Sequence, residues 1–290
     1  MSDQRTVLVT GATGNQGGAA VDALLERGHK VIALTRNADT PQAGRLASRG
    51  VRIAAGDFSD YNSLVEAASG ADTAYAMMTP LESGTEAETR QGLTLIEAIK
   101  AAGVGHLIFG SVANADSHTG IPHFDSKFRV EQALATLGVP YSIVAPVYFM
   151  DNLLAPWNLA ALKAGAMPMA MPAERMLQQI AVSDIGHFAA ALTERRDAVF
   201  GKRYDIAGDA LTGTSAAALV SKASGREIRF ESFPPDMLRA DSEDMALMFE
   251  WFGRTGYSAD IKALHLDFPE IPWLTYEDWL SRQDWSAVLK

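Results

Sequence analysis

A glycine-rich run near the start of the chain carries the clearest chemical signal in the sequence. Residues Thr10–Gly18 read TGATGNQGG and follow an apolar segment that begins at Thr6. In a strand–turn–helix of this kind, Gly11 permits a tight turn, Gly14 lets backbone N–H groups approach a pyrophosphate, and Gly17 lets the helix pack closely on the strand. The run predicts a dinucleotide-binding turn. The alternative interpretation is a strand-to-helix turn that binds no ligand.

The residue after the second apolar segment bears on which dinucleotide such a turn would hold. An acidic residue at this place hydrogen-bonds the ribose hydroxyls of NAD, whereas this chain has Thr35-Arg36-Asn37. A guanidinium at Arg36 favours a 2′-phosphate, so NADP is expected in preference to NAD, which stays a candidate. The segment from Arg36 to Arg52 contains four arginines, Arg36, Arg45, Arg49 and Arg52, and one acid, Asp39. The alternative interpretation of this cluster is a solvated helix face.

A third segment, Gly56-Asp57-Phe58, ends the next apolar run. Asp57 could accept a hydrogen bond from the adenine amino group while Phe58 flanks the ring. The alternative is that Asp57 only neighbours a helix N-cap. The cofactor contacts expected so far are Gly11, Thr13, Gly14, Asn15, Gln16, Gly17, Arg36, Asp57 and Phe58.

Alternating apolar and amphipathic segments must position these residues. Apolar runs predict strands buried on both faces, and apolar residues at three- and four-residue spacing predict helices between them. The expected strands are Thr6–Thr10, Lys30–Thr35, Val51–Gly56, Asp72–Met78, Leu107–Ser111 and Tyr141–Val147, and the expected helices are Gly17–Arg27, Tyr61–Ala68, Glu86–Ala102 and Phe124–Leu137. Glycines at 28, 70, 103 and 138 stand where left-handed helix caps belong. This order predicts an α/β fold, a doubly wound parallel sheet of the Rossmann type.

The alternation ends near residue 150, where a Pro- and Met-rich stretch, Ala155–Pro172, begins. Beyond it we expect a helix near Ser183-Asp184, a strand at Arg203–Ala207, a helix from Ser215, a strand at Glu227–Ser232, and helices near Asp236–Phe252 and Thr275–Ser281. This is too little alternation for an independent second sheet. We expect a dinucleotide-binding domain at 1–150 and a smaller, mostly helical substrate-binding lobe at 151–290, with chain exchange between the two.

Composition excludes several classes of function. The 290 residues carry a net charge of −10, which disfavours direct binding to nucleic acid. The absence of cysteine removes disulfides, thiolate nucleophiles and Cys-ligated zinc, and the six histidines show no metal-binding spacing, so no metal is expected. The longest apolar runs are about half the roughly 20 residues of a membrane helix, and no apolar signal core opens the chain. A cytoplasmic protein without membrane contact is expected.

Several segments together resemble one known family. They are Thr10–Gly18, Thr35-Arg36-Asn37, Gly56-Asp57 and the PHFDSKFRVE run at Pro122–Glu131. With a closing segment at Thr275–Leu280, they are similar to the NmrA-like family of atypical short-chain dehydrogenases/reductases over nearly the whole chain. That family combines redox enzymes with dinucleotide-sensing regulators. The resemblance implies that Lys127 reaches the nicotinamide ribose and that Tyr148 and Phe149 line the nicotinamide pocket, and the remaining expected cofactor contacts are Met78 and Thr79.

The catalytic position differs from that of ordinary short-chain dehydrogenases. Those enzymes use Tyr-x-x-x-Lys, in which the phenol gives or takes the substrate proton, whereas here His123 stands at the Tyr position, one helical turn before Lys127. His123 could act as a general acid, orient substrate or ribose by hydrogen bonding, or only pack and cap the helix. For Lys127 the alternative is an ion pair with Glu131. Ser111 stands where a reductase places a carbonyl-binding hydroxyl, or it is a satisfied serine at a strand end.

An aromatic and thioether group would suit a flat, apolar ligand, or it forms core. Its members are Tyr148, Phe149, Met150, Trp157, Met167, Met169 and Met171. The candidate catalytic residues are His123, Lys127, Ser111 and Tyr148, and the candidate substrate contacts are His123, Tyr148, Met150, Asn152 and Trp157. The sequence predicts an NADP(H)-dependent oxidoreductase for a hydrophobic aromatic, quinone or conjugated carbonyl compound. The alternative is a non-catalytic NADP(H) sensor that binds a protein partner, and a homodimer is also considered.

Overall fold

The computed structural model describes residues 4–80 and 84–290. The chain forms two compact units that exchange segments. The first comprises Met1–Ser117, Pro122–Ala145 and Ser183–Tyr204, and the second comprises His118–Ile121, Pro146–Val182 and Asp205–Lys290. The expected division into a domain at 1–150 and a lobe at 151–290 stays a prediction.

A seven-stranded sheet organises the first unit, with strand order β10-β6-β5-β4-β1-β2-β3. The strands are β1 (Thr6–Val9), β2 (Lys30–Thr35), β3 (Arg52–Ala55), β4 (Thr73–Met77), β5 (Leu107–Gly110), β6 (Tyr141–Pro146) and β10 (Arg203–Ile206). The neighbouring strands among β1 to β6 pair in parallel. The direction of winding reverses between β1 and β4, and ligands of open α/β sheets bind at the carboxyl ends of the strands at such a point.

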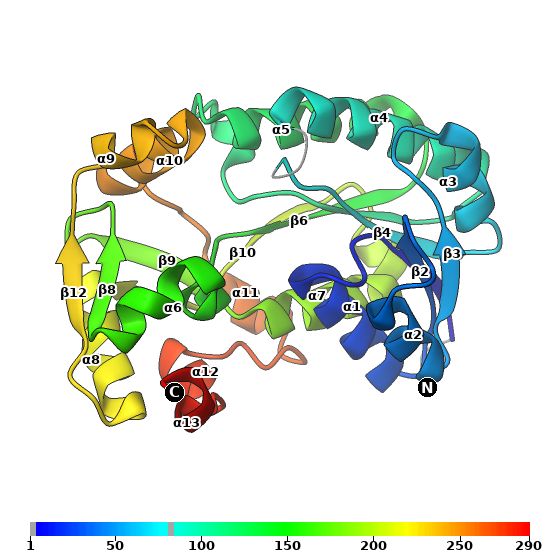
Figure 1. Ribbon diagram of the computed structural model, residues 1–290. Coiled ribbons are helices and arrows are strands. Elements are labelled where there is room, and N and C mark those ends of the chain that lie inside the picture. The colour runs from blue at the N-terminus through cyan, green and yellow to red at the C-terminus, as the bar shows by residue number, and fades with distance from the viewer. Residues whose placement is uncertain (1–3, 81–83) are drawn as a thin grey trace. The chain divides into compact units, whose positions relative to one another are not determined.

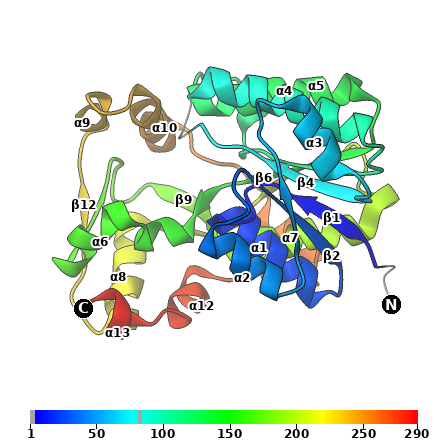
Figure 2. The same ribbon diagram turned by 45° about the vertical axis from the view of Figure 1, so that its right-hand side comes forward.

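Helices cover both faces of this sheet (Figures 1 and 2). One face carries α1 (Asn15–Glu26), α2 (Pro41–Ser48) and α7 (Val182–Arg195), and the other carries α3 (Tyr61–Ala68), α4 (Thr85–Ala101) and α5 (Pro122–Leu137). The core between the sheet and α3–α5 includes Leu8, Ile96 and Phe109, all at most 1% exposed. Burial on both faces explains the uninterrupted apolar runs of the strands.

The structure confirms the doubly wound fold and places each of the first six strands within one residue of its predicted ends. The four predicted glycine caps have φ between 74° and 80°, the left-handed region in which glycine has no Cβ to clash. Helix α2 was not predicted as an element. It begins at Pro41 because Thr40 caps it by accepting a hydrogen bond from the Ala43 N–H at 3.2 Å.

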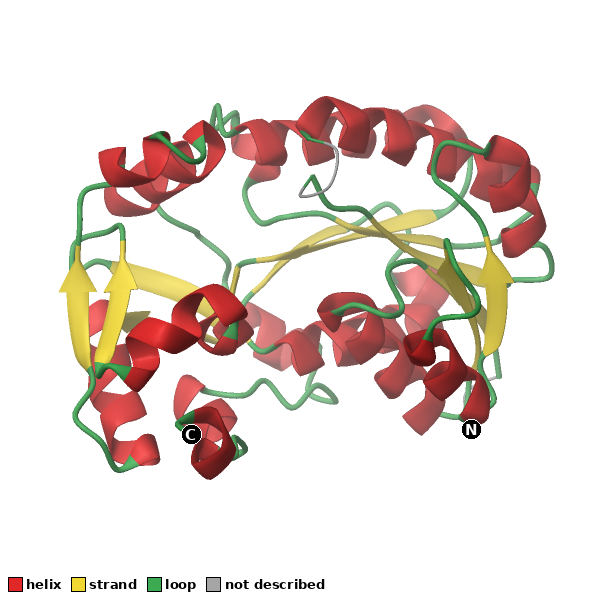
Figure 3. Ribbon diagram, in the orientation of Figure 1, coloured by secondary structure: helices red, strands yellow, loops and turns green. Residues whose placement is uncertain are grey.

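The second unit is mostly helical but also contains two small sheets (Figure 3). Its strands are β7 (Tyr148–Phe149), β9 (Met176–Ile180) and β11 (Asp209–Thr212) in one sheet, and β8 (Ala166–Met169) and β12 (Arg229–Ser232) in the other. Its helices are α6 (Pro156–Lys163), α8 (Gly213–Ser224), α9 (Asp236–Arg239), α10 (Glu243–Arg254), α11 (Ile261–Asp267), α12 (Tyr276–Ser281) and α13 (Trp285–Val288), with a short 3₁₀ helix, η2, at Met150–Leu154.

The expectation that this half has too few strands for a sheet of its own is therefore wrong. Most of these strands have four or fewer residues. Strands β8 and β9 consist mainly of Met, Gln, Ala, Leu and Pro, with Ile180 as their one β-branched residue, so they leave little periodic signal. Among the helices that the structure describes, none is both long and apolar enough to cross a membrane.

Candidate functional site

The predicted dinucleotide turn has the backbone geometry that an anion site needs. Gly11 has φ +61°, and its carbonyl accepts a hydrogen bond from the Gly14 N–H at 2.9 Å. A Cβ at Gly17 would lie 2.2 Å from the Gly11 carbonyl oxygen, so only glycine allows this approach of α1 to the turn. Helix α1 has no side-chain cap and no acid in its first turn. Its N-terminal N–H groups and positive dipole end therefore fit a phosphate.

Two side chains of the turn tie it to β4. The Thr10 hydroxyl donates to the Met77 carbonyl at 2.7 Å and accepts from the Met77 N–H at 2.8 Å. The Gln16 side-chain amide donates to the hydroxyl of Tyr75 at 2.6 Å, and burial raises the pKa of that tyrosine well above its ordinary value. Gln16 thus holds the turn in place, and it also lines a cleft at this edge of the sheet.

A cleft of about 560 Å³ runs along the carboxyl ends of β1 to β4 in the first unit. Its volume lies in the range of ligand sites. Its wall contains eleven of the predicted cofactor residues, namely Gly11, Thr13, Gly14, Asn15, Gln16, Gly17, Arg36, Asp57, Phe58, Met78 and Thr79. Leu34, Thr35, Asn37, Thr40, Gln42, Gly56, Met77 and Gln91 complete it.

The structure separates the arginines that the sequence groups together. Arg36 lines the cleft at the end of β2. Arg49 instead pairs with Asp22 of α1 at 2.7 Å, and Arg52 donates to the carbonyl of Ser69 behind α3 at 3.0 Å. Arg45 is exposed on α2 and is not part of the cleft wall. Arg36 thus contributes to the cleft wall. Arg45 and Arg49 lie on and directly after α2 and match the alternative of a solvated helix face, whereas Arg52 lies on β3.

Asp57 holds the loop after β3 in place while facing the cleft. Its Oδ1 accepts from the hydroxyl of Ser59 at 2.5 Å and from the Ser59 N–H at 2.7 Å. These hydrogen bonds, with a further contribution from the Arg36 charge, lower the pKa of Asp57 below its ordinary value. Asp60, not Asp57, is the N-cap of α3. Asp57 is therefore an anionic side chain beside the cleft.

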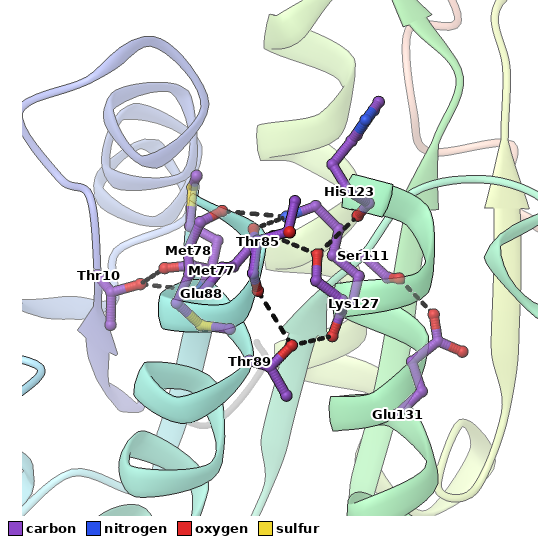
Figure 4. A network of polar contacts seen from close by, with 11 residues as sticks. Thr10, Met77, Met78, Thr85, Glu88, Thr89, Ser111, His123, Lys127 and Glu131 are labelled. Carbon is purple, nitrogen blue, oxygen red and sulfur yellow. Dashed lines mark hydrogen bonds and ion pairs between the residues drawn. The ribbon is translucent and has the colours of Figure 1, made fainter. Parts of the chain in front are cut away.

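Lys127 forms a buried ion pair with a residue that sequence reasoning missed (Figure 4). Its Nζ contacts Oε1 of Glu88 on α4 and donates to the carbonyl of Met78 at 3.2 Å. The second carboxylate oxygen of Glu88 accepts from the hydroxyl of Ser126 at 2.5 Å. Glu88 is 0% exposed and Lys127 9%. The alternative of an ion pair between Lys127 and Glu131 is wrong.

Glu131 belongs to a second buried network with Ser111 (Figure 4). The Ser111 hydroxyl donates to Oε1 of Glu131, and Arg203 of β10 donates to Oε2 at 3.0 Å. Burial raises the pKa of Glu131 above its ordinary value, although Arg203 and the Ser111 hydrogen bond oppose that shift. The hydroxyl proton of Ser111 is thus directed at Glu131, which matches the satisfied-serine alternative. Its role toward a substrate carbonyl stays a prediction.

His123 lies in the first turn of α5, four residues before Lys127. Its carbonyl accepts from the Ser126 hydroxyl at 3.0 Å, and its ring makes an edge contact with Phe124 at 4.8 Å between centroids. In Figure 4 the imidazole extends away from the Lys127–Glu88 pair. The side chains of His123 and Lys127 therefore point in different directions, although the spacing puts both residues on one face of the helix.

The remaining predicted residues lie in the second unit. Tyr148 and Met150 line a small pocket of about 30 Å³ together with Met167, Met169 and Met171. Tyr148 is hydrogen-bonded to the side chain of Asn152, but burial outweighs this contact and raises the pKa of the phenol to about 12. Phe149 is half-buried at the start of η2. Trp157 is 71% exposed on α6 and does not line this pocket.

The apolar group was interpreted either as a surface for a flat ligand or as core, and the methionines of this pocket bear on both. Met150, Met167 and Met171 are at most 7% exposed, so they are core residues that also form the pocket wall.

Within residues 4–80 and 84–290, no three His, Asp or Glu side chains gather as metal ligands would.

Comparison with known proteins identifies the family. The NmrA-like family matches residues 3–280. An NAD(P)H azoreductase of Xenophilus azovorans is 32% identical over 226 residues, 77% of this chain and 76% of that protein. The solved NADPH complex of the NADPH-dependent quinone oxidoreductase QOR2 of Escherichia coli is similar with a TM-score of 0.79 at 25% identity, covering 95% of this chain and 98% of that one.

A regulator shares the fold as well. The solved NADP complex of NmrA, a negative transcriptional regulator, has a TM-score of 0.81 at 19% identity, covering 98% of this chain and 99% of that one. At that identity the likeness concerns the fold alone. Because the family match spans nearly the whole chain and the azoreductase is similar over most of both proteins, this chain belongs to the NmrA-like family.

Proposed function

We propose that this protein is an NADP(H)-dependent oxidoreductase that acts on hydrophobic aromatic, quinone or conjugated carbonyl compounds. The observation that carries the proposal is the cleft of the first unit. It joins an uncapped, acid-free helix N-terminus to Arg36 at the end of β2. That combination suits a pyrophosphate at one point and a 2′-phosphate at another.

The strand order gives the direction of the cofactor in this proposal. Arg36 and Asp57 follow β2 and β3 on one side of β1, whereas Met78 and Thr79 follow β4 on the other side. The pyrophosphate belongs at α1, beside β1. The adenosine half is therefore assigned to the β2 side and the nicotinamide half to the β4 side. When bound, the nicotinamide supplies hydride transfer, and the protein supplies orientation and electrostatics.

The chain's own residues have limited means to supply a proton. The raised pKa of Tyr148 keeps its phenol protonated at neutral pH, so it can donate a hydrogen bond but is a weak acid. Imidazole is a common general acid in enzymes, so His123 is the other candidate. A quinone yields a stabilised anion on reduction, so it needs less assistance from a strong acid than a simple ketone does. The site thus favours acceptors of this electronic type.

The relatives support the same substrate class. One is named for azo compounds and the other for quinones, and both of these acceptors are conjugated. The pocket of the second unit has methionines and aromatic rings in its wall, but its volume of about 30 Å³ is too small for such a molecule, so the substrate class rests on the relatives.

A regulatory function is the second candidate, and two observations favour it. The residue at the usual Tyr position is His123, whose ring extends away from the Lys127–Glu88 pair, and the Ser111 hydroxyl is directed at Glu131. A protein that binds NADP(H) only as a signal, and responds by binding a protein partner, needs no proton donor at these positions.

Steady-state kinetics separate the two candidates. Purified protein is mixed with NADPH and a panel of quinones, azo dyes and aromatic ketones, and the loss of absorbance at the NADPH band is followed. The oxidoreductase proposal expects many turnovers per chain with at least one acceptor class, and fastest reaction with quinones or azo dyes. Tight NADPH binding with no turnover across the panel would instead support the sensor.

A further inference from the structure

We propose that Glu88 allows this protein to bind oxidised as well as reduced cofactor. It does so by neutralising the charge of Lys127, which would otherwise disfavour the oxidised form at the nicotinamide half of the cleft. Glu88 is a fully buried carboxylate on α4 that no step of the proposed chemistry uses. This inference rests on the cofactor orientation proposed above. It concerns binding and requires no catalytic turnover.

The contacts of Glu88 and Lys127 fix the position of the pair. Lys127 Nζ reaches across from α5 to the carbonyl of Met78, a residue of the cleft wall directly after β4. Glu88 is held by Lys127 through one carboxylate oxygen and by the Ser126 hydroxyl through the other. The Thr89 hydroxyl adds a hydrogen bond to the carbonyl of Ser126 at 3.3 Å, which ties α4 to α5 at this level. The pair therefore lies directly behind Met78, a residue of the wall on the β4 side.

The charge of the pair matters because the two forms of the cofactor differ by one charge at the nicotinamide ring. The oxidised ring is a cation, and the reduced ring is neutral. A lone ammonium near that ring would repel the oxidised form and leave the reduced form nearly unaffected. Buried charges are poorly screened, so this effect would persist at ordinary salt concentration. With Glu88 in contact with Lys127, the pair has no net charge, and both forms are accepted.

The test measures the ratio of the Kd of NADP⁺ to the Kd of NADPH, by calorimetry or fluorescence at pH 7, in three variants. Glu88→Gln keeps the side-chain shape and leaves the ammonium uncompensated, so the ratio should rise by at least about threefold, the modest end of the effect of one unit charge inside a protein. Lys127→Met leaves the carboxylate alone, so the ratio should fall. The double variant should return to the wild-type ratio.

A matched control comes from the same helix. Glu86 lies two residues earlier, is 87% exposed in its side chain and pairs with Arg90 at 3.9 Å. Glu86→Gln removes the same charge from the exposed surface, and it should leave the ratio unchanged because water screens it.

The sign pattern separates electrostatics from damage to the fold. A variant that only disturbs the wall weakens both cofactor forms equally and leaves the ratio at its wild-type value, which would overturn the inference. If Glu88→Gln does not fold, Lys127→Met alone decides, because an unchanged or raised ratio contradicts the proposal. Failure of the proposed function is a different result, namely that the wild-type protein binds neither form.

Discussion

Gly17 is the residue on which the dinucleotide turn depends most directly. A Cβ there would overlap the Gly11 carbonyl oxygen at 2.2 Å, and no flexible side chain can yield because the neighbouring atoms are backbone. We expect Gly17→Ala to displace α1 from the turn, to abolish NADPH binding and to lower the melting temperature. Gly18→Ala is the matched control, because its Cβ would meet only the Ala12 carbonyl oxygen at an ordinary 3.6 Å. Unaltered NADPH affinity in Gly17→Ala would show that the turn does not hold the cofactor.

Arg36 is expected to select the phosphorylated dinucleotide. Replacing it by alanine removes the guanidinium from the cleft wall, so NADPH binding should weaken by roughly tenfold or more while NADH binding changes little. The Kd values of both cofactors for Arg36→Ala provide the measurement. Arg45→Ala serves as control, since Arg45 is exposed outside the cleft. Equal weakening of NADPH and NADH would remove the case for a 2′-phosphate contact.

Single residues of the site differ in how far the sequence reveals them. Gly11, Gly14 and Gly17 could be recognised because each has a backbone role at fixed spacing in a local turn. Glu88 could not, because its burial and its contact with Lys127 depend on how α4 and α5 pack, and no local pattern encodes that. A Glu in the first turn of a helix is usually solvated. The sequence instead offered Glu131, the acid four residues after Lys127, as its partner.

Strands β5 and β6 are joined at their start by a buried histidine that should make stability sensitive to acid. The Ser142 hydroxyl donates to the Val199 carbonyl at 2.9 Å, so we assign His106 Nε2, 2.9 Å from the same hydroxyl, as the donor to Ser142. Burial, with a contribution from the Arg196 charge, lowers the pKa of His106 to about 3. The unfolded chain binds a proton below about pH 6.5, while the folded chain does not until about pH 3.

Stability should therefore fall as the pH drops below 6.5, by a contribution from His106 approaching about 1.4 kcal/mol per pH unit. Urea unfolding between pH 7.5 and 5 measures the free energy of unfolding for the wild type and for His106→Asn. The variant retains a donor for Ser142 but cannot take up the proton, so its stability should decline less steeply with acid. Parallel pH profiles for the two proteins would refute this assignment.

At the level of elements, the sequence was most informative where burial is uniform. Strands such as Leu107–Gly110 are buried on both faces and leave an unbroken apolar run, so all six early strands were found to within one residue. Strands β9 and β11 could not be predicted in this way. They pair antiparallel with each other, and the paired residues run from Asp209 with Gln179 to Thr212 with Met176, far apart in the sequence. Strand β11 is half-buried throughout, so neither an apolar run nor an alternation marks it.

The molecule as a whole combines a cofactor cleft formed within the first unit and a methionine-lined pocket formed within the second. The chain belongs to the NmrA-like family, and solved proteins with this fold were crystallised with NADP or NADPH. The choice between turnover and sensing depends on the residues near Lys127 rather than on the fold, because the fold serves both kinds of protein.

Isothermal calorimetry of dinucleotide-free protein is the most direct test of the central claim, that the N-terminus of α1 holds the bridging phosphates of NADP(H). We predict heat with both NADP⁺ and NADPH, a stoichiometry of one per chain, and a weaker interaction with NADH. Absence of heat with every pyridine dinucleotide, from protein whose folding is verified in the same sample, would contradict it.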